Sequence, residues 1–284
     1  MTAETKGVVM AESGSWKTLV DGDGSEGIVL AVDFDTTGRP EARFSDLVAN
    51  LGTGLTVWET VPPAHGTEHA RSGKGYIDYW AARLEEERPP VRALLGFCAG
   101  AVYAAALAER IAGWQEGEPR LIVFDPEISV SQTLMWQYHK VVGFMSSVIS
   151  EADVAAAREA GLKVLEACPE IGALRDGLIR LIREIGEPAF TRVGLDAARR
   201  EELFTVFESF LSYLAAASEL DPVDRWRRAV AFSSASPLSG LRAMRSSGVG
   251  EGVTVAREVE MDVEHGSMLA HRELAVAVEG LLRG

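Results

Sequence analysis

Apolar and polar positions follow a regular order through the first part of the chain. Short apolar runs bounded by turn residues predict buried strands at four places: 27–32, 55–58, 91–97 and 121–124. Helical patterns separate the last three runs, at 76–87 and at 101–112. Because strands that alternate with helices pair in parallel, the sequence predicts an α/β fold with a mostly parallel central sheet and helices on both faces.

The alternation of strand and helix patterns stops after the fourth run. Ser150 and Asp153 have the spacing of a capping box and predict the start of a helix. Two helical stripes follow, one at 171–185 that Gly186 and Pro188 close, and one at 203–214. The sequence therefore predicts a helical segment between the fourth strand and the rest of the sheet.

We predict that residues 128–220 form a helical lid inserted over the carboxyl edge of the sheet, and that 1–127 and 221–284 form the core. A separate helical domain is the alternative. The order of strand and helix then returns, because alternating apolar positions at 253–263 predict a strand and 273–282 predict a last helix.

Composition fits one large soluble domain. The chain has 284 residues, of which 47% are hydrophobic, and this is enough for a single core. No run reaches the ~18 to 20 apolar residues of a membrane span, and the first residues lack the features of a secretory signal. Cys98 and Cys168 form no disulfide framework, and reduced thiols suit a cytosolic protein. We expect a cytoplasmic protein with no membrane partner.

The net charge of −14 argues against nucleic acid as a partner, because a phosphate backbone needs a basic face. The sequence has no dinucleotide-binding or phosphate-binding glycine motif. His65 and His69 are the nearest approach to a pair of metal ligands, but they lie in a loop with Pro and Gly that we expect to be solvated. We expect no metal and no cofactor.

The segment Gly96-Phe97-Cys98-Ala99-Gly100 lies between a predicted strand and a predicted helix. A G-x-S-x-G sequence in that position is the nucleophile elbow of α/β-hydrolases, and cysteine here takes the place of the serine. A helix N-terminus and a paired imidazolium both favour a thiolate, so we expect Cys98 to be a nucleophile with a lowered pKa. The N–H of Ala99 is then a donor to the oxyanion. The alternative is that Cys98 is a small buried apolar residue.

Two further residues follow the elbow in the order that this chemistry needs. Asp125 ends the next strand, where a carboxylate can reach and orient a histidine above the sheet; Glu127 is its substitute. His265 lies between the last predicted strand and the last helix and is the candidate general base, with His271 as its competitor. The sequence predicts the order Cys98, Asp125, His265.

At these residues the chain resembles the thioesterase family of nonribosomal-peptide and polyketide synthesis. The similarity lies in 76–111 through the elbow, in LIVFDPE at 121–127 and in VEHGSML at 263–269. It implies the α/β-hydrolase fold with a helical lid, a thioester substrate on an acyl or peptidyl carrier protein or on coenzyme A, and no cofactor.

The sequence departs from that family at two places. Cysteine replaces the usual serine, and an acyl group on Cys98 keeps the energy of a thioester, so hydrolysis, transfer and cyclisation all stay open. The family has a Pro- and Gly-rich turn after the first core strand that supplies the second oxyanion donor, whereas this chain has Asp33-Phe34-Asp35. By position, the N–H of Phe34 or Asp35 would serve. The two carboxylates would disfavour negative charge unless they point away or meet a cation.

Carrier proteins are generally acidic, so an acidic enzyme needs a local basic patch. Arg225, Arg227 and Arg228 form the densest candidate, and a solvated helix face is the alternative. Two other functions stay open. A dienelactone-hydrolase-like enzyme would take its acid from beyond the lid, at Asp221 or Asp224. A non-catalytic relative would bind an acyl group or a partner without the full Cys, Asp and His set.

Overall fold

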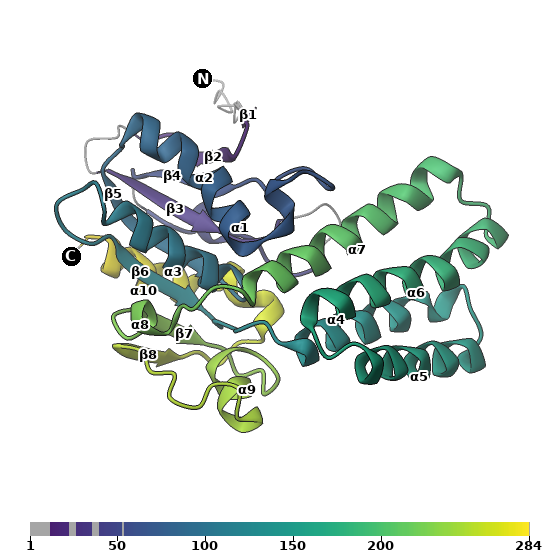
Figure 1. Ribbon diagram of the computed structural model, residues 1–284. Helices are drawn as coiled ribbons and strands as arrows, with labels where there is room; N and C mark the ends of the chain where they lie inside the picture. Colours follow the sequence, from purple (N-terminus) through teal and green to yellow (C-terminus); the bar gives the residue numbers. More distant parts are fainter. Residues whose placement is uncertain (1–11, 23–26, 36–39, 53, 284) are drawn as a thin grey trace, which may run out of the picture. The chain divides into compact units, whose positions relative to one another are not determined.

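The computed structural model of the protein describes residues 12–22, 27–35, 40–52 and 54–283. The chain divides into two compact units, and each is made of segments that are separate in the sequence. The first, here called the sheet unit, comprises Met1–Pro62, Tyr79–Glu127 and Pro222–Gly284. The second, the helical unit, comprises Pro63–Asp78 and Ile128–Asp221. Figure 1 labels the elements of both units.

The sheet unit contains eight described strands in the order β1-β2-β4-β3-β5-β6-β7-β8. Strands β3 to β8 pair in parallel, and β1 and β2 are antiparallel at one edge. Their bounds are β1 Glu12–Ser13, β2 Trp16–Val20, β3 Ile28–Val32, β4 Thr56–Thr60, β5 Val91–Phe97, β6 Arg120–Phe124, β7 Val230–Ser233 and β8 Arg257–Glu260. The carboxyl ends of the parallel strands therefore share one edge of the sheet.

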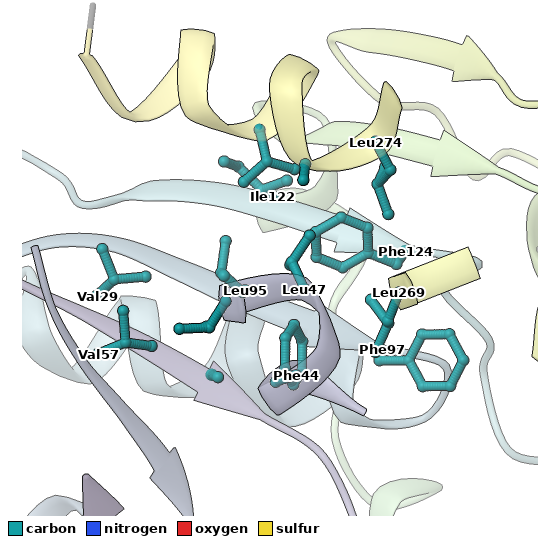
Figure 2. Packing of buried hydrophobic residues seen from close by; sticks show 14 of the residues in the cluster. Val29, Phe44, Leu47, Val57, Leu95, Phe97, Ile122, Phe124, Leu269 and Leu274 are labelled. Carbon is teal, nitrogen blue, oxygen red and sulfur yellow. The ribbon is translucent and has the colours of Figure 1, made fainter. Parts of the chain in front are cut away.

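Helices cover both faces of the sheet. Their bounds are α1 Phe44–Ala49, α2 Gly73–Glu87, α3 Gly100–Ile111, α8 Val223–Trp226, α9 Gly240–Ser247 and α10 Arg272–Arg283. Side chains of α1 and α10 pack with Leu95 in one apolar cluster (Figure 2). The next residue, Gly96, faces α3 instead, because successive residues of a strand point to opposite faces. The central strands β3 and β5 are accordingly buried almost throughout.

The predicted strands at 27–32, 55–58, 91–97 and 121–124 are confirmed as β3 to β6, and the predicted parallel sheet is confirmed. The prediction of a strand over 253–263 is wrong beyond 257–260, where β8 makes a short edge strand. Strands β2 and β7 were not predicted. They are as short as the strands that were predicted, β2 lies near the antiparallel edge of the sheet, and β7 pairs with β6, which is far away in the sequence.

The helical unit contains four long helices: α4 Ser131–Phe144, α5 Glu151–Ala167, α6 Ile171–Arg192 and α7 Ala197–Ala217. The predicted start of α5 is confirmed, since Ser150 Oγ accepts from the Asp153 N–H at 3.1 Å. The predicted end of α6 at Gly186 and Pro188 is wrong. A Cβ at Gly186 would lie 2.8 Å from the Phe204 ring, so the glycine permits packing between α6 and α7 instead of ending the helix.

Within the described part of the chain, no helix has the length and apolarity that crossing a bilayer needs.

Candidate active site

The predicted elbow is built by two glycines that have no room for a side chain. A Cβ at Gly96 would lie 2.6 Å from the Ala101 Cα, and one at Gly100 would lie 2.2 Å from the Val32 carbonyl oxygen. Gly96 therefore lets β5 lie against α3, and Gly100 lets the start of α3 lie against the end of β3. This close approach forces the sharp turn at the residues between them.

Cys98 occupies that turn with φ of 51°, a left-handed conformation that is rare for residues with a side chain. Such a backbone costs about 1 kcal/mol or more and persists only where neighbours hold it. The Cys98 N–H donates to the Phe124 carbonyl at 2.9 Å, and the Cys98 carbonyl accepts from the Glu127 N–H at 3.3 Å. The end of β6 thus holds the strained residue in place.

Asp125 follows β6 and, like Cys98, has a left-handed backbone that hydrogen bonds hold in place. Its φ is 41°, its side chain is 1% exposed, and its N–H donates to the Phe232 carbonyl of β7 at 2.8 Å. Oδ1 accepts from the Ser234 N–H at 2.8 Å. Gly240 lies against this carboxylate, and a Cβ there would come within 2.7 Å of Oδ1.

The other carboxylate oxygen of Asp125 lies 2.7 Å from His265 Nδ1. The His265 ring also stacks on Phe97, the residue before the cysteine, with centroids 4.7 Å apart. The backbone N–H of His265 donates to Ser236 Oγ at 2.8 Å. The structure therefore brings Asp125 and His265 together, and Asp125 rather than Glu127 is the carboxylate in contact with His265. A hydrogen bond on Nδ1 leaves Nε2 as the ring nitrogen that can exchange protons.

The Cys98 sulfur has a different polar neighbour. Sγ donates to Glu127 Oε2 at 3.8 Å, and no hydrogen bond joins it to the ring of His265, although both residues belong to the described part of the chain. Hydrogen bonds of catalytic groups are often long or absent without substrate. Glu127 therefore enters the site beside the sulfur rather than as the partner of the histidine.

The environment of the thiol reverses one expectation from the sequence. Burial raises the pKa of Cys98 well above its ordinary value, and the charges of Glu127, Asp33 and Asp125 raise it further. The Ala99 N–H lowers this pKa through a hydrogen bond but does not outweigh them. The prediction of a lowered pKa was wrong, because the sequence pattern showed the helix N-terminus and not the three carboxylates.

The expected second oxyanion donor is already engaged. The Phe34 N–H donates to Asp33 Oδ1 at 2.7 Å, so Asp33 would have to turn away before an oxyanion could use it. The Asp35 carboxylate, in contrast, is neutralised by Lys17 at 2.5 Å and Arg43 at 3.2 Å. The role of the Asp35 N–H stays a prediction.

The arginines that were candidates for carrier docking lie at the other end of the strands from Cys98. Arg225 belongs to α8 and, with Arg228, precedes β7, whereas Cys98 and Asp125 follow the carboxyl ends of β5 and β6. All three arginines are ion-paired, Arg225 and Arg228 with Glu118 and Arg227 with Asp224. Docking there stays a prediction, and this geometry counts against it.

Sequence reasoning missed the residues that support the acid and the histidine. Ser234 and Ser236 follow β7, and because that strand was not recognised, nothing marked this serine-rich segment as part of the site. The stacking of Phe97 on His265 was also missed, since it joins residues far apart in the sequence.

The sheet order, the elbow and the acid after the neighbouring strand define a class: the chain has the α/β-hydrolase fold. No protein-family model and no curated protein matches the chain. Among solved structures it is similar to an α/β hydrolase from a Medee basin deep-sea metagenome library, at 12% identity and a TM-score of 0.52, over 94% of this chain and 91% of that one.

Two further structures are similar at comparable levels. The enol-lactonase from Burkholderia xenovorans LB400 matches at 14% identity and a TM-score of 0.54, over 94% of each chain. A four-domain nonribosomal peptide synthetase bound to AMP and glycine matches at 14% identity and a TM-score of 0.56, over 95% of this chain. The present chain spans 20% of the length of that synthetase. At these identities the similarity is one of fold.

Proposed function

We propose that this protein is an acyl-processing enzyme of the thioesterase type, in which Cys98 takes an acyl group from a thioester on a carrier protein or on coenzyme A. The observation that carries the proposal is the 2.7 Å contact between Asp125 and His265, made beside a strained cysteine at the carboxyl edge of the sheet. The similarity of the sequence to thioesterases of nonribosomal-peptide and polyketide synthesis points to the substrate class.

The first half-reaction transfers the acyl group to sulfur. His265 takes the proton of the Cys98 thiol, the sulfur adds to the thioester carbonyl, and the Ala99 N–H donates to the oxyanion. The carbonyl re-forms when the bond to the leaving sulfur breaks, and His265 gives the proton to that sulfur, which departs as the free thiol. Because the pKa of Cys98 is raised, the thiol form predominates before substrate binds, and the mechanism needs His265 to remove the proton.

The second half-reaction releases the acyl group to water, to an amine or to a hydroxyl. An acyl-S-enzyme holds more transfer energy than an ester on serine, so transfer and ring closure compete with hydrolysis. We propose that the helical segment 128–220 acts as the lid that limits water at the thioester. The acceptor then depends on which nucleophile, water, an amine or a hydroxyl, this segment lets reach the thioester.

Intact-protein mass spectrometry tests the acyl-enzyme. After incubation with N-acetylcysteamine thioesters, we expect the wild type to gain the mass of one acyl group and Cys98→Ala to gain none. Cys168→Ala, at the second free cysteine, is the matched control and should be acylated like the wild type. Label on Cys98→Ala would remove Cys98 from the mechanism.

Comparison with Cys98→Ser tests the fate of the acyl group. On the same thioester, with an added amine, we expect the wild type to give a higher ratio of amide or ring to free acid than Cys98→Ser. If both proteins release only free acid at similar rates, the enzyme is a plain thioesterase and transfer is not its function.

Two alternatives are less well supported. A dienelactone-hydrolase-like site would need an acid from beyond the lid, but Asp224 pairs with Arg227 while Asp125 contacts His265. A non-catalytic acyl-binding protein would have no use for a histidine held by a buried carboxylate. Turnover of thioesters by the wild type and loss of turnover in His265→Ala would exclude that alternative.

A further inference from the structure

A second potential site lies at the amino edge of the sheet. A cavity of about 370 Å³ opens there between the starts of β5 and β6, α8 and the end of α10. Arg92 and Arg120 line it from the two strands, where Ala93 pairs with Arg120. These strands separate the cavity from the Cys98 site by roughly 16 to 20 Å at about 3.3 Å per residue. A molecule bound in the cavity therefore cannot be the one that reacts at Cys98.

The cavity is strongly cationic within an acidic protein. Four arginines line it, Arg92, Arg120, Arg225 and Arg228, and Glu118 is the carboxylate among the lining residues. Glu118 bridges Arg225 at 3.2 Å and Arg228 at 2.6 Å, and this pairing holds its pKa below the ordinary value. Arg120 is exposed and has no ion-pair partner among the described residues. The lining keeps an excess of three positive charges, although the whole chain carries −14.

The geometry of these groups favours one class of ligand. Guanidinium groups bind phosphate oxygens in pairs, with a planar fork that fits phosphate and carboxylate. The volume falls within the range of small-molecule sites, roughly 300 to 1,000 Å³. Ala108, Leu121 and Leu281 add an apolar wall on which an uncharged part of a ligand can pack. In the structure, Glu118 occupies the position of an anion between Arg225 and Arg228.

We propose that this cavity binds a small molecule that carries phosphate groups, at a site separate from Cys98. The phosphate oxygens contact Arg120 and compete with Glu118 for Arg225 and Arg228. This inference does not depend on the chemistry at Cys98, because the residues of the two sites do not overlap.

Titration of the whole protein with inorganic pyrophosphate, followed by calorimetry and thermal unfolding at constant ionic strength, tests the proposal. We expect saturable binding with a Kd below about 1 mM and a melting temperature that rises with ligand concentration. Arg120→Gln and Arg228→Gln should each weaken binding by about tenfold. Glu118→Gln should strengthen it, because the competing carboxylate is removed.

Arg227→Gln is the matched control, since Arg227 pairs with Asp224 and does not line the cavity. It makes the same change of charge beside Arg228 and should bind pyrophosphate like the wild type. ADP in place of pyrophosphate distinguishes the ligand sources: tighter binding of ADP indicates a nucleotide, and equal binding indicates the phosphate groups alone. Unchanged affinity in Arg120→Gln and Arg228→Gln, or citrate binding as tightly as pyrophosphate, would overturn the proposal.

Discussion

At the Cys98 sulfur, burial and charge act in the same direction. Both favour the neutral thiol, since the apolar surroundings and the carboxylate of Glu127 at 3.8 Å disfavour a second negative charge. A cysteine in this environment differs from one that rests as a thiolate–imidazolium pair. A raised pKa leaves less thiolate at neutral pH, so we expect slow reaction with electrophiles from solution.

Alkylation of Cys98 by iodoacetamide should therefore titrate above the ~8.5 of a free thiol. Glu127→Gln removes the nearest negative charge and should shift the titration to lower pH. Glu127→Asp keeps the charge and serves as the control. The rate of alkylation against pH, followed by mass spectrometry, measures this shift. A wild-type titration below that of a free thiol would contradict the assigned environment.

Asp33 is the second residue whose local contact bears on the proposed reaction. Its carboxylate accepts the Phe34 N–H that an oxyanion would use. Asp33→Ala frees that donor and removes a negative charge, so acylation of Cys98 should become faster by about tenfold. Asp33→Asn removes the charge but keeps an acceptor for Phe34, and a smaller gain is expected. Single-turnover acylation rates measure both, and slower acylation of Asp33→Ala would show that the carboxylate supports the reaction.

At the scale of elements, the pairing of β2 with β4 buries a carboxyl group. Glu59 of β4 is fully buried, Lys17 of β2 lies 2.8 Å from it, and burial raises the pKa of Glu59 to about 7. Between the ordinary value of 4.5 and about 7, the folded protein holds a proton that the unfolded chain has released. The free energy of unfolding should then fall as the pH rises through this window, by up to about 3 kcal/mol.

Glu59→Gln should flatten this dependence and make the protein more stable than the wild type at pH 8. Urea denaturation at several pH values between 4.5 and 8 gives the free energy of unfolding for each variant. Glu85→Gln changes an exposed glutamate and should keep the wild-type slope. If Glu59→Gln also keeps that slope, Glu59 is ionised in the folded protein throughout.

At the scale of the molecule, charge is distributed unevenly between the two edges of the sheet. Carboxylates surround the Cys98 sulfur at the carboxyl edge, while arginines line the cavity at the amino edge. A carrier protein bound at Arg225 and Arg228 would hold its thioester at the wrong end of the strands. The opposite charges at the two edges therefore favour different ligands for the two proposed sites.

The double variant Arg225→Gln, Arg228→Gln tests this separation. The KM for a carrier-bound thioester should stay within about twofold of the wild type, because rim charges act on binding only where the partner contacts them. The same variant should lose pyrophosphate binding. A tenfold rise of KM for the carrier-bound substrate, with KM for N-acetylcysteamine thioesters unchanged, would restore these arginines as a docking site.

The sequence by itself determined the parts of this protein that depend on neighbours along the chain. Apolar runs predicted β3 to β6 because a strand buried on both faces needs little more than its own side chains to be recognised. Two glycines around Cys98 predicted the elbow, since close approach of strand and helix excludes any Cβ there. Strand β7 was missed although it is as long as the predicted run at 121–124, and its place in the sheet comes from its pairing with β6. Gly186 and Pro188 misplaced the end of α6, because glycine serves packing as well as termination.

Tertiary structure alone decided which residues of the site contact one another and which charges surround them. Asp125 and His265 are 140 positions apart, and only the parallel pairing of β6, β7 and β8 brings them to 2.7 Å. The raised pKa of Cys98, the engaged N–H of Phe34 and the arginine cavity depend on which charges meet across the fold. Charge acts through space over distances that chain order does not encode, so the sequence predicted the candidate site residues and the structure determined their environment.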